Sequence, residues 1–384
     1  MNIYWITKIN KKRFYSTSRF ELAKALRERG HHVTLITERK IGEKPHVDNN
    51  EIRVPSVPSR IISRFFFGLL ILMYVPFIIR KQKIDVVLLD GANIWSPFAL
   101  SIKLFRIPII LDIRTISTDK EKSLETLYYD TSLNLSKFIV NGVTTITPEL
   151  RDVLVKKYHI SKEKIGIWTT GVSKELLNKP VEQEKTNTIT IEPGCMYLMY
   201  HGTYEITRGI ENLIESIAEL EDPLKKKTRL MIVGIDNIKT KELLELINKV
   251  GLNEKIRLIP PVDYQDICLY LDACNVGVIP LSPQYIWWQT CAPLKTLEYL
   301  SRGKPVIATN IPFHQRIFNK GKCGLLLPSS DKKTLAEAIT KIYTEKDSLI
   351  EMGAVGREIV KQYYTWDHSA SDLEEFMTKI IMMK

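Results

Sequence analysis

Short apolar runs alternate with longer amphipathic segments along the whole chain. At the start, residues 3–7 predict a strand, residues 16–29 a helix that ends at Gly30, and residues 32–36 a second strand. A strand, a helix and a strand in this order form a β-α-β unit, and its repetition builds a parallel sheet with helices on both faces. The same pattern predicts strands over 86–89, 108–111, 143–146 and 165–168, and helices from about 97 and over 148–157.

The pattern restarts after a stretch without sustained apolar periodicity. Residues 173–194 are rich in Lys, Glu, Asn, Thr and Pro, which predicts a linker. A chain of 384 residues is long for a single core. We therefore expect an α/β protein of two domains, 1–172 and 195–365, with a final helix over 366–384 that crosses back to the first domain. The second half predicts strands over 196–200, 230–233, 256–259 and 276–279, and helices over 211–220, from about 241, from about 265, over 332–343 and over 348–363.

The stretch 293–309 carries the most specific local signal. Pro293 opens a short helix, Gly303 ends it, and an apolar run over 305–308 predicts a buried strand. In open parallel sheets ligands bind beyond the carboxyl ends of the strands, where a helix amino terminus attracts phosphate. Lys295 and Glu298 are expected to face that crevice, with Glu298 accepting hydrogen bonds from a sugar diol. The alternative is that both are solvated charges on a surface helix.

Two further loops follow strand ends. Gly202 and Arg208 lie between the strand 196–200 and the next helix, an arrangement suited to a phosphate. Alternatively, Arg208 forms a salt bridge with a neighbouring helix. Asp112 and Arg114 end the strand 108–111, where such sheets present functional groups. An Asp at this position can equally cap the following turn.

Two segments have unusual aromatic or apolar composition. Residues 285–290 include Trp287 and Trp288, which suggests contact with a sugar, a lipid or the facing domain, or packing beneath the loop. Residues 65–79 are apolar and flanked by basic residues. This run is shorter than the ~20 residues needed to span a bilayer and contains Pro76. Residues 61–83 are expected to lie in a membrane interface or in the core.

Composition narrows the function classes. The formal charge of +11 predicts an anionic partner, such as a phosphate or an acidic membrane surface. Nucleic acid is disfavoured because the basic residues are dispersed rather than interleaved with aromatic ones. The five cysteines form no Cys-x-x-Cys pair, and the sequence opens on a strand rather than a leader, so reduced thiols in the cytoplasm are expected. The histidines lack metal-ligand spacing, and no Gly-x-Gly-x-x-Gly run indicates a nicotinamide cofactor.

The motifs together resemble one known family. The stretch 293–309, its continuation over 323–327, and the segments 201–203 and 208–210 resemble the retaining, nucleotide-sugar-dependent glycosyltransferases of group 1. The first half matches more loosely, over 29–33 and 112–114. The resemblance implies the GT-B fold, with two Rossmann-like doubly wound parallel-sheet domains and a cleft between them. The first domain would bind the acceptor and the second the nucleotide sugar.

The resemblance also implies roles for individual residues. By position, Glu298 would hold the donor ribose, and Thr290 stands where the family usually has a Glu that touches the transferred sugar. Thr203 stands where an Arg is common, and Arg208 where a Lys is common. The glycine pair expected in the first loop is absent near residues 15–16. The implied donor site comprises Gly202, Thr203, Arg208, Thr290, Pro293, Leu294, Lys295 and Glu298, and the implied catalytic residues are Asp112, Arg208 and Lys295.

The sequence thus predicts a peripheral enzyme at the inner face of the cell membrane. It would move a hexose, with retention, from a nucleoside diphosphate sugar to a lipid-linked or glycan acceptor, with neither metal nor cofactor. Arg208, Lys295 and the amides at Leu294 and Lys295 would stabilise the leaving diphosphate. The alternative, motivated by Thr290, is a catalytically silent GT-B subunit that binds a membrane or a partner enzyme. A sugar-nucleotide epimerase is disfavoured because no carboxylate and histidine acid–base set is evident.

Overall fold

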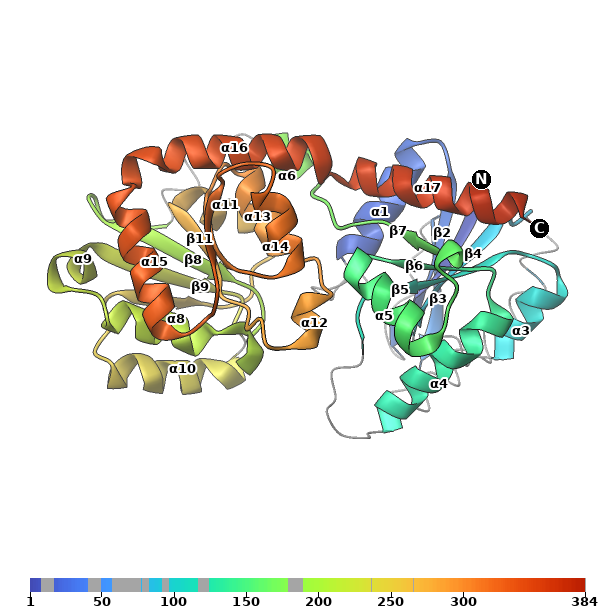
Figure 1. Cartoon of the computed structure of the whole chain (residues 1–384), viewed down its shortest axis with the longest axis horizontal. Coiled ribbons are helices and arrows are strands. Elements are labelled where there is room, and N and C mark those ends of the chain that lie inside the picture. Colours follow the sequence, from blue (N-terminus) through green and yellow to red (C-terminus); the bar gives the residue numbers. More distant parts are fainter. Residues whose placement is uncertain are drawn as a thin grey trace. The chain divides into compact units, whose positions relative to one another are not determined.

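The protein folds as two compact units. The computed structural model describes residues 1–7, 17–40, 50–56, 77, 83–91, 97–116, 124–178, 189–235, 237–264 and 266–383. The first unit comprises residues 1–170, 290–292 and 366–384, and the second comprises residues 171–289 and 293–365. Figure 1 shows a sheet flanked by helices in each unit. The apolar segment predicted over 61–83 lies outside the described residues except for residues 77 and 83.

The first unit is built on a parallel sheet. Its described strands lie in the order β3-β2-β1-β4-β5-β6-β7, and every pairing among them is parallel. The chain order reverses between β1 and β4, so the switch point that open α/β sheets use for ligands lies between these strands. The strands are β1 (Asn2–Ile6), β2 (His32–Lys40), β3 (Glu51–Ser56), β4 (Val86–Asp90), β5 (Ile109–Ile113), β6 (Gly142–Thr145) and β7 (Ile165–Ile167).

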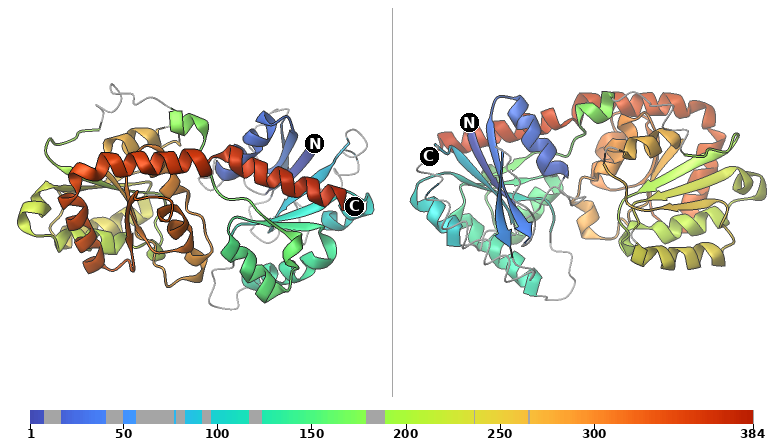
Figure 2. Two further views of the ribbon diagram at one scale, coloured as in Figure 1. Left: turned by 45° about the horizontal axis from the view of Figure 1, so that its top comes forward. Right: turned by 180° about the vertical axis from the view of Figure 1, so that it is seen from behind.

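Helices pack on both sides of this sheet (Figure 2). The last helix, α17 (Trp366–Met382), contacts α1 (Thr17–Glu28) and β7, and its buried Leu373 and Met377 join the core of the first unit. Arg29, just after α1, donates through Nε to Glu374 of α17 at 2.7 Å. The other helices of this unit are α3 (Pro97–Leu104), α4 (Leu124–Ile139) and α5 (Pro148–Tyr158).

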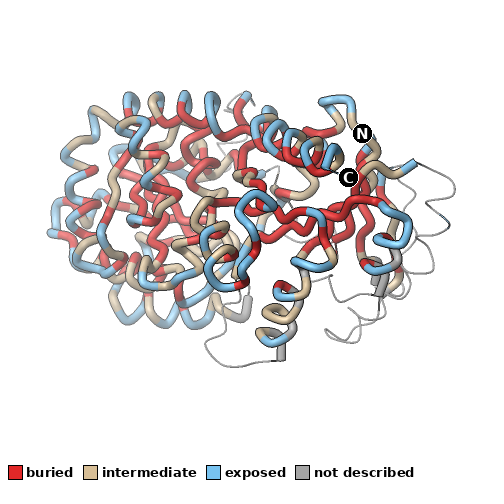
Figure 3. Tube along the Cα trace, turned by 45° about the vertical axis from the view of Figure 1, so that its right-hand side comes forward, coloured by how far each residue is buried: buried red, intermediate tan, exposed pale blue. Residues whose placement is uncertain are grey.

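The second unit repeats the architecture. Its described strands lie in the order β10-β9-β8-β11-β12-β13, again all parallel. The central strands are buried, whereas the outer faces of the helices are exposed (Figure 3). These strands are β8 (Met196–His201), β9 (Thr228–Val233), β10 (Ile256–Ile259), β11 (Val276–Ile279), β12 (Val306–Thr309) and β13 (Gly324–Leu327).

The helices of the second unit divide between the two faces of its sheet (Figure 1). On one face, α8 contacts α10 and α15, and on the other α13 contacts β11, β12 and α16. These elements are α8 (Ile210–Ala218), α10 (Asn237–Lys249), α11 (Ile267–Ala273), α13 (Leu294–Ser301), α15 (Lys332–Thr344) and α16 (Leu349–Tyr363). The shorter helices are α6 (Lys174–Asn178), α9 (Asp222–Lys227), α12 (Ile286–Gln289) and α14 (Pro312–Phe318).

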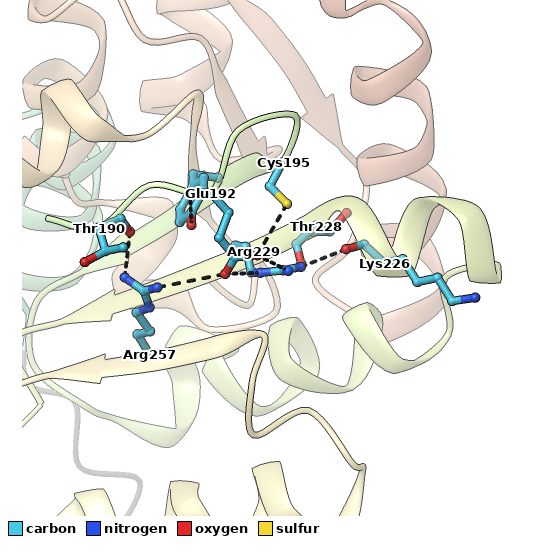
Figure 4. Close-up of polar contacts among 8 residues, drawn as sticks. Thr190, Glu192, Cys195, Lys226, Thr228, Arg229 and Arg257 are labelled. Carbon is cyan, nitrogen blue, oxygen red and sulfur yellow. Dashed lines mark hydrogen bonds and ion pairs between the residues drawn. The ribbon is translucent and has the colours of Figure 1, made fainter.

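The stretch predicted as a linker, 173–194, contains ordered structure at both ends. It begins with α6, in which Leu176 and Leu177 are buried. At its other end Glu192 accepts from Arg229 of β9 through Oε1 at 3.0 Å (Figure 4). Arg257 of β10 donates to the carbonyl of Thr190 at 2.7 Å. Residues 189–194 are therefore anchored to the second sheet. Residues 179–188 lie outside the described residues, and the linker stays a prediction.

The two-domain α/β architecture predicted from the sequence is confirmed. Several elements were not predicted: β3, α4, α6, α9, α12, α14 and β13. Most of these are short, and β3 contains Pro55, a residue typical of edge strands because it cannot donate to a ladder. In the part of the chain that the structure describes, no helix is both long and apolar enough to cross a membrane.

Candidate functional site

Lys295 and Tyr200 bring α13 and β8 together in the second unit. The Lys295 ammonium donates to the Tyr200 hydroxyl at 3.1 Å and lies 4.6 Å from the centre of its ring. Gly202 follows β8 with φ of +121°, and a Cβ built there would come within 2.2 Å of the Lys295 Nζ. The positive φ favours glycine at this position, and the approach of a ligand to its backbone stays a prediction.

Arg208 lies beside this pair on the single turn η4 (Ile206–Arg208), just before α8. Its Nε is 3.4 Å from a carboxylate oxygen of Glu205, and its guanidinium lies 5.2 Å from the centre of the Trp288 ring. The alternative drawn from the sequence, a salt bridge to a neighbouring helix, is not what the structure shows, because Glu205 belongs to the same turn. An ion pair to an exposed carboxylate three residues away is weak and easily exchanged for a ligand.

The positive charges of Lys295 and Arg208 repel each other. Burial lowers the pKa of Lys295 well below its ordinary value, and the charge of Arg208 lowers it further, against the opposing effects of Glu298 and Glu205. Burial also raises the pKa of Tyr200 to about 12, so its hydroxyl stays protonated and can serve as a hydrogen-bond donor or acceptor. A site that holds two positive charges close together favours an anion that offers several oxygens.

The amino terminus of α13 adds neutral donors. Its N-cap is Pro293, whose side chain cannot accept a hydrogen bond. The first-turn amides that begin at Leu294 therefore donate to no capping side chain. Such amides, together with the helix dipole, attract a phosphate oxygen. Because Lys295 belongs to the same first turn, the amides and the ammonium group lie at the same end of the helix.

Glu298, one turn further along α13, pairs with a histidine that the sequence did not connect to it. The His201 Nε2 lies 2.7 Å from Glu298 Oε2, and both side chains are 8% exposed. Because a carboxylate only accepts, Nε2 carries the hydrogen. His201 Nδ1 is buried without a partner among the described residues, and Glu298 Oε1 takes no hydrogen bond from them. The histidine thus fixes one carboxylate oxygen and leaves the other for a ligand.

Of the two remaining residues of the implied donor site, Thr203 contacts this cluster through its carbonyl, and Thr290 belongs to the first unit. Thr203 is exposed, and its carbonyl accepts from the Tyr200 hydroxyl at 3.2 Å. Thr290 is buried and groups with the first unit, where its carbonyl accepts from the Thr147 hydroxyl at 2.7 Å. A contact between Thr290 and the donor sugar therefore remains a prediction.

In the first unit, Asp112 is the centre of a closed polar network. Its Oδ1 accepts from Thr144 at 3.0 Å and from the Trp168 indole at 3.1 Å, while its Oδ2 accepts from Arg114 Nε at 2.7 Å. The Asp112 side chain is only 1% exposed. These contacts orient Arg114, and a catalytic role for Asp112 stays a prediction. The guanidinium of Arg114 lies over Trp168 at 4.5 Å and donates to Ser18 of α1.

A second ion pair lies at the same carboxyl edge of the first sheet. Arg19 of α1 is 2.8 Å from the Asp90 carboxylate at the end of β4, and the Thr7 hydroxyl also donates to Asp90. Thr7 and Asp90 follow the two strands that flank the switch point. Neither Asp90 nor Arg19 was singled out in the sequence, although Asp90 closes an apolar run, which is the signal by which Asp112 was chosen.

The aromatic segment 285–290 is only partly exposed. Tyr285 and Trp287 stack with ring centres 4.5 Å apart, and the Trp288 indole donates to the Thr207 carbonyl at 3.1 Å. The described contacts of Trp288 are thus with the turn that carries Arg208, and the alternatives drawn from the sequence stay open. Among the described residues no group of three or more His, Cys, Asp or Glu could hold a metal ion.

Comparison with known proteins finds similar sequences and similar folds. The profile of the glycosyl transferases group 1 matches residues 182–359, and that of glycosyltransferase family 4 matches residues 16–176. The sucrose-phosphate synthase of Thermosynechococcus elongatus superposes with a TM-score of 0.79 at 18% identity, over 100% of both chains. Anabaena HepE, solved in complex with UDP-glucose, gives a TM-score of 0.73 at 13% identity, over 99% of this chain and 100% of the other.

The two parallel sheets and these structural neighbours define the GT-B class of fold. The first profile lies in the second half of the chain and the second profile in the first half, so the chain is similar to glycosyltransferases over both halves. A curated relative is the D-inositol 3-phosphate glycosyltransferase of Pseudarthrobacter chlorophenolicus, 23% identical over 57% of this chain and 51% of the relative. The chain therefore spans about half the length of the curated relatives that it matches.

Proposed function

We propose that the protein transfers a hexose from a nucleoside diphosphate sugar to a lipid-linked or glycan acceptor at the cytoplasmic face of the membrane. The observation that carries the proposal is the placement of Arg208 and Lys295 around Tyr200 at the amino terminus of α13. The chain is similar to glycosyltransferases over both halves, and a relative of the same fold was solved with UDP-glucose. A diphosphate supplies the charge and the oxygen atoms that this cluster favours.

The chemistry follows from where charge develops. As the bond between the sugar and the diphosphate breaks, negative charge grows on the leaving group. Arg208, Lys295 and the first-turn amides of α13 would be positioned to stabilise it without a metal ion. In this scheme Glu298 accepts a hydrogen bond from the donor ribose through Oε1, while His201 holds Oε2. We propose retention of configuration, with the acceptor hydroxyl attacking the sugar on the same face from which the diphosphate departs, rather than a double displacement through a carboxylate nucleophile.

The acceptor is proposed to bind the first unit. The half-buried Arg114 and Arg19 lie at the carboxyl edge of its sheet, where α/β folds bind ligands. A lipid-linked acceptor is supported by the formal charge of +11, which favours an anionic membrane surface, and by the basic-flanked apolar run over 61–83. Two other acceptors are to be tested. One is a glycan, and the other is a polyol phosphate such as D-inositol 3-phosphate, after which the curated relatives are named.

Turnover across a donor panel tests the proposal. Release of nucleoside diphosphate is measured with UDP and GDP sugars, using acceptors in anionic vesicles, soluble glycans and D-inositol 3-phosphate. We expect release with at least one donor, and at least a tenfold loss of kcat/KM in Glu298→Ala, because a hydrogen bond to a buried carboxylate is worth roughly 1.5–3 kcal/mol. Equal turnover in the wild type and Glu298→Ala would refute the site assignment.

A second candidate is a catalytically silent subunit that binds a membrane or a partner enzyme. It is favoured by Thr290, which stands at the position of a family Glu and whose carbonyl is bonded within the first unit. Calorimetry with uridine and guanosine diphosphates separates the two candidates. Binding of neither nucleotide favours the silent subunit, whereas binding with donor turnover favours the transferase.

A further inference from the structure

The turn that carries Arg208 is held in place by hydrogen bonds from a different segment of the chain. η4 is only three residues long, and a single turn of 3₁₀-helix has few internal hydrogen bonds with which to fix a side chain. The buried Thr207 carbonyl in its middle accepts from the Ser282 amide at 3.1 Å and from the Trp288 indole at 3.1 Å. Both donors come from the segment between β11 and α13.

Gly209 brings the two segments into close contact. It follows Arg208 with φ of +68°, and a Cβ built there would lie 2.2 Å from the Pro280 carbonyl oxygen. A larger residue would therefore separate the turn from the segment that starts at Pro280. The contact places α12, with Trp288, against the turn that carries Arg208.

Trp288 contacts both the backbone and the side chain of this turn. Its indole N–H fixes the carbonyl of Thr207, and its ring lies 5.2 Å from the Arg208 guanidinium carbon. A cation over an indole face is attracted by the ring quadrupole, which limits the directions that the guanidinium takes. The neighbouring Trp287 instead stacks its ring on Tyr285.

We propose that Trp288 is a positioning residue: it holds the Arg208 guanidinium where it meets the outer phosphate of a bound nucleoside diphosphate. The inference rests on the proposed function, in which Arg208 binds that diphosphate. Trp288 acts through Arg208 and not through the nucleoside, so its contribution depends on the presence of the second phosphate and of the arginine.

Calorimetry on the full chain tests this proposal. Uridine and guanosine diphosphates are compared first, and the tighter-binding one is then used together with the matching monophosphate. We expect Trp288→Leu to weaken diphosphate binding roughly tenfold and monophosphate binding by less than about threefold. Trp288→Phe keeps a ring without the N–H and is expected to fall between the wild type and Trp288→Leu. In the Arg208→Ala background Trp288→Leu is expected to add less than about threefold.

Trp287→Leu is the matched control, expected to leave diphosphate affinity within about threefold, because its ring is stacked on Tyr285. Equal losses for mono- and diphosphate, or an undiminished effect without Arg208, would overturn the proposal, and so would wild-type affinity in Trp288→Leu. If Trp288→Leu does not fold, judged by its melting temperature, Trp288→Phe carries the same comparison. Failure of the wild type to bind any nucleoside diphosphate would instead overturn the proposed function, and this inference with it.

Discussion

At the scale of single residues, Lys295 shows how burial prepares a charge for a ligand. Its ammonium is bonded to the Tyr200 hydroxyl, and its pKa is lowered by burial and by Arg208. An anion bound between the two cations would raise that pKa again. At a pH between the lowered value of the free protein and the raised value of the complex, binding must therefore take up a proton.

Calorimetry in two buffers of different ionisation enthalpy measures this uptake. We expect net proton uptake on binding of a nucleoside diphosphate by the wild type, and its loss in Lys295→Met. Lys304→Met is the control, because the Lys304 ammonium contacts the carbonyl of Asp272. Binding without proton uptake across the alkaline range, or the same uptake in Lys295→Met, would contradict this role for Lys295.

Candidate site residues could be predicted from the sequence, but their hydrogen-bond partners could not. Lys295 and Glu298 were chosen from their place in the first turns of a helix opened by a proline, and Gly202 and Arg208 from a loop after a strand. The partner of Glu298 could not be inferred, because His201 lies 97 residues away in the sequence and only the parallel sheet brings them together. For the same reason Asp112 could not be recognised as enclosed by Thr144 and Trp168.

At the scale of elements, a buried histidine joins α13 to α14. His314 of α14 is fully buried; its Nδ1 donates to the Thr309 carbonyl at 2.6 Å, and its Nε2 lies 2.9 Å from the Thr296 hydroxyl. Burial lowers the pKa of His314 from 6.5 to about 4. Between these values the unfolded chain binds more protons than the folded one, so the free energy of unfolding falls as the pH is lowered through this range.

The whole effect amounts to about 3 kcal/mol at most. Chemical denaturation from about pH 7 to about pH 4 measures it. We expect His314→Gln to be less stable near neutral pH by about 1–3 kcal/mol and to lose less of its remaining stability on acidification than the wild type. His159→Gln, at the exposed end of α5, is the control and should follow the wild type. Parallel curves for His314→Gln and the wild type would exclude this role for His314.

Residues that start or end a helix, such as proline and glycine, decided which elements could be predicted from the sequence. Pro293 and Gly303 delimit α13 within a residue or two, and the apolar run after them becomes β12. By contrast, α14 has only seven residues, and α12 four, so neither shows a helical period. The contact between α12 and the turn of Arg208 is a tertiary contact. It therefore could not be predicted from the residue pattern of either segment alone.

At the scale of the whole molecule, the two units carry different sets of charged residues. The second unit holds the paired cations, the α13 amides and Glu298; the first holds a buried network of arginines and aspartates at the carboxyl edge of its own sheet. The two-unit plan was predictable because the β-α-β pattern occurs twice. The position of Thr290 in the first unit was not, since it lies three residues before Pro293 in the sequence.

The most direct test of the central claim is a crystal structure of the full chain with a bound nucleoside diphosphate sugar. We expect the diphosphate between Arg208 and Lys295, with its oxygens facing the first-turn amides of α13, and the ribose at Glu298 Oε1. The same structure would show whether Thr290 or Trp287 contacts the sugar. A donor bound to the first unit, or a diphosphate that contacts neither Arg208 nor Lys295, would contradict the claim.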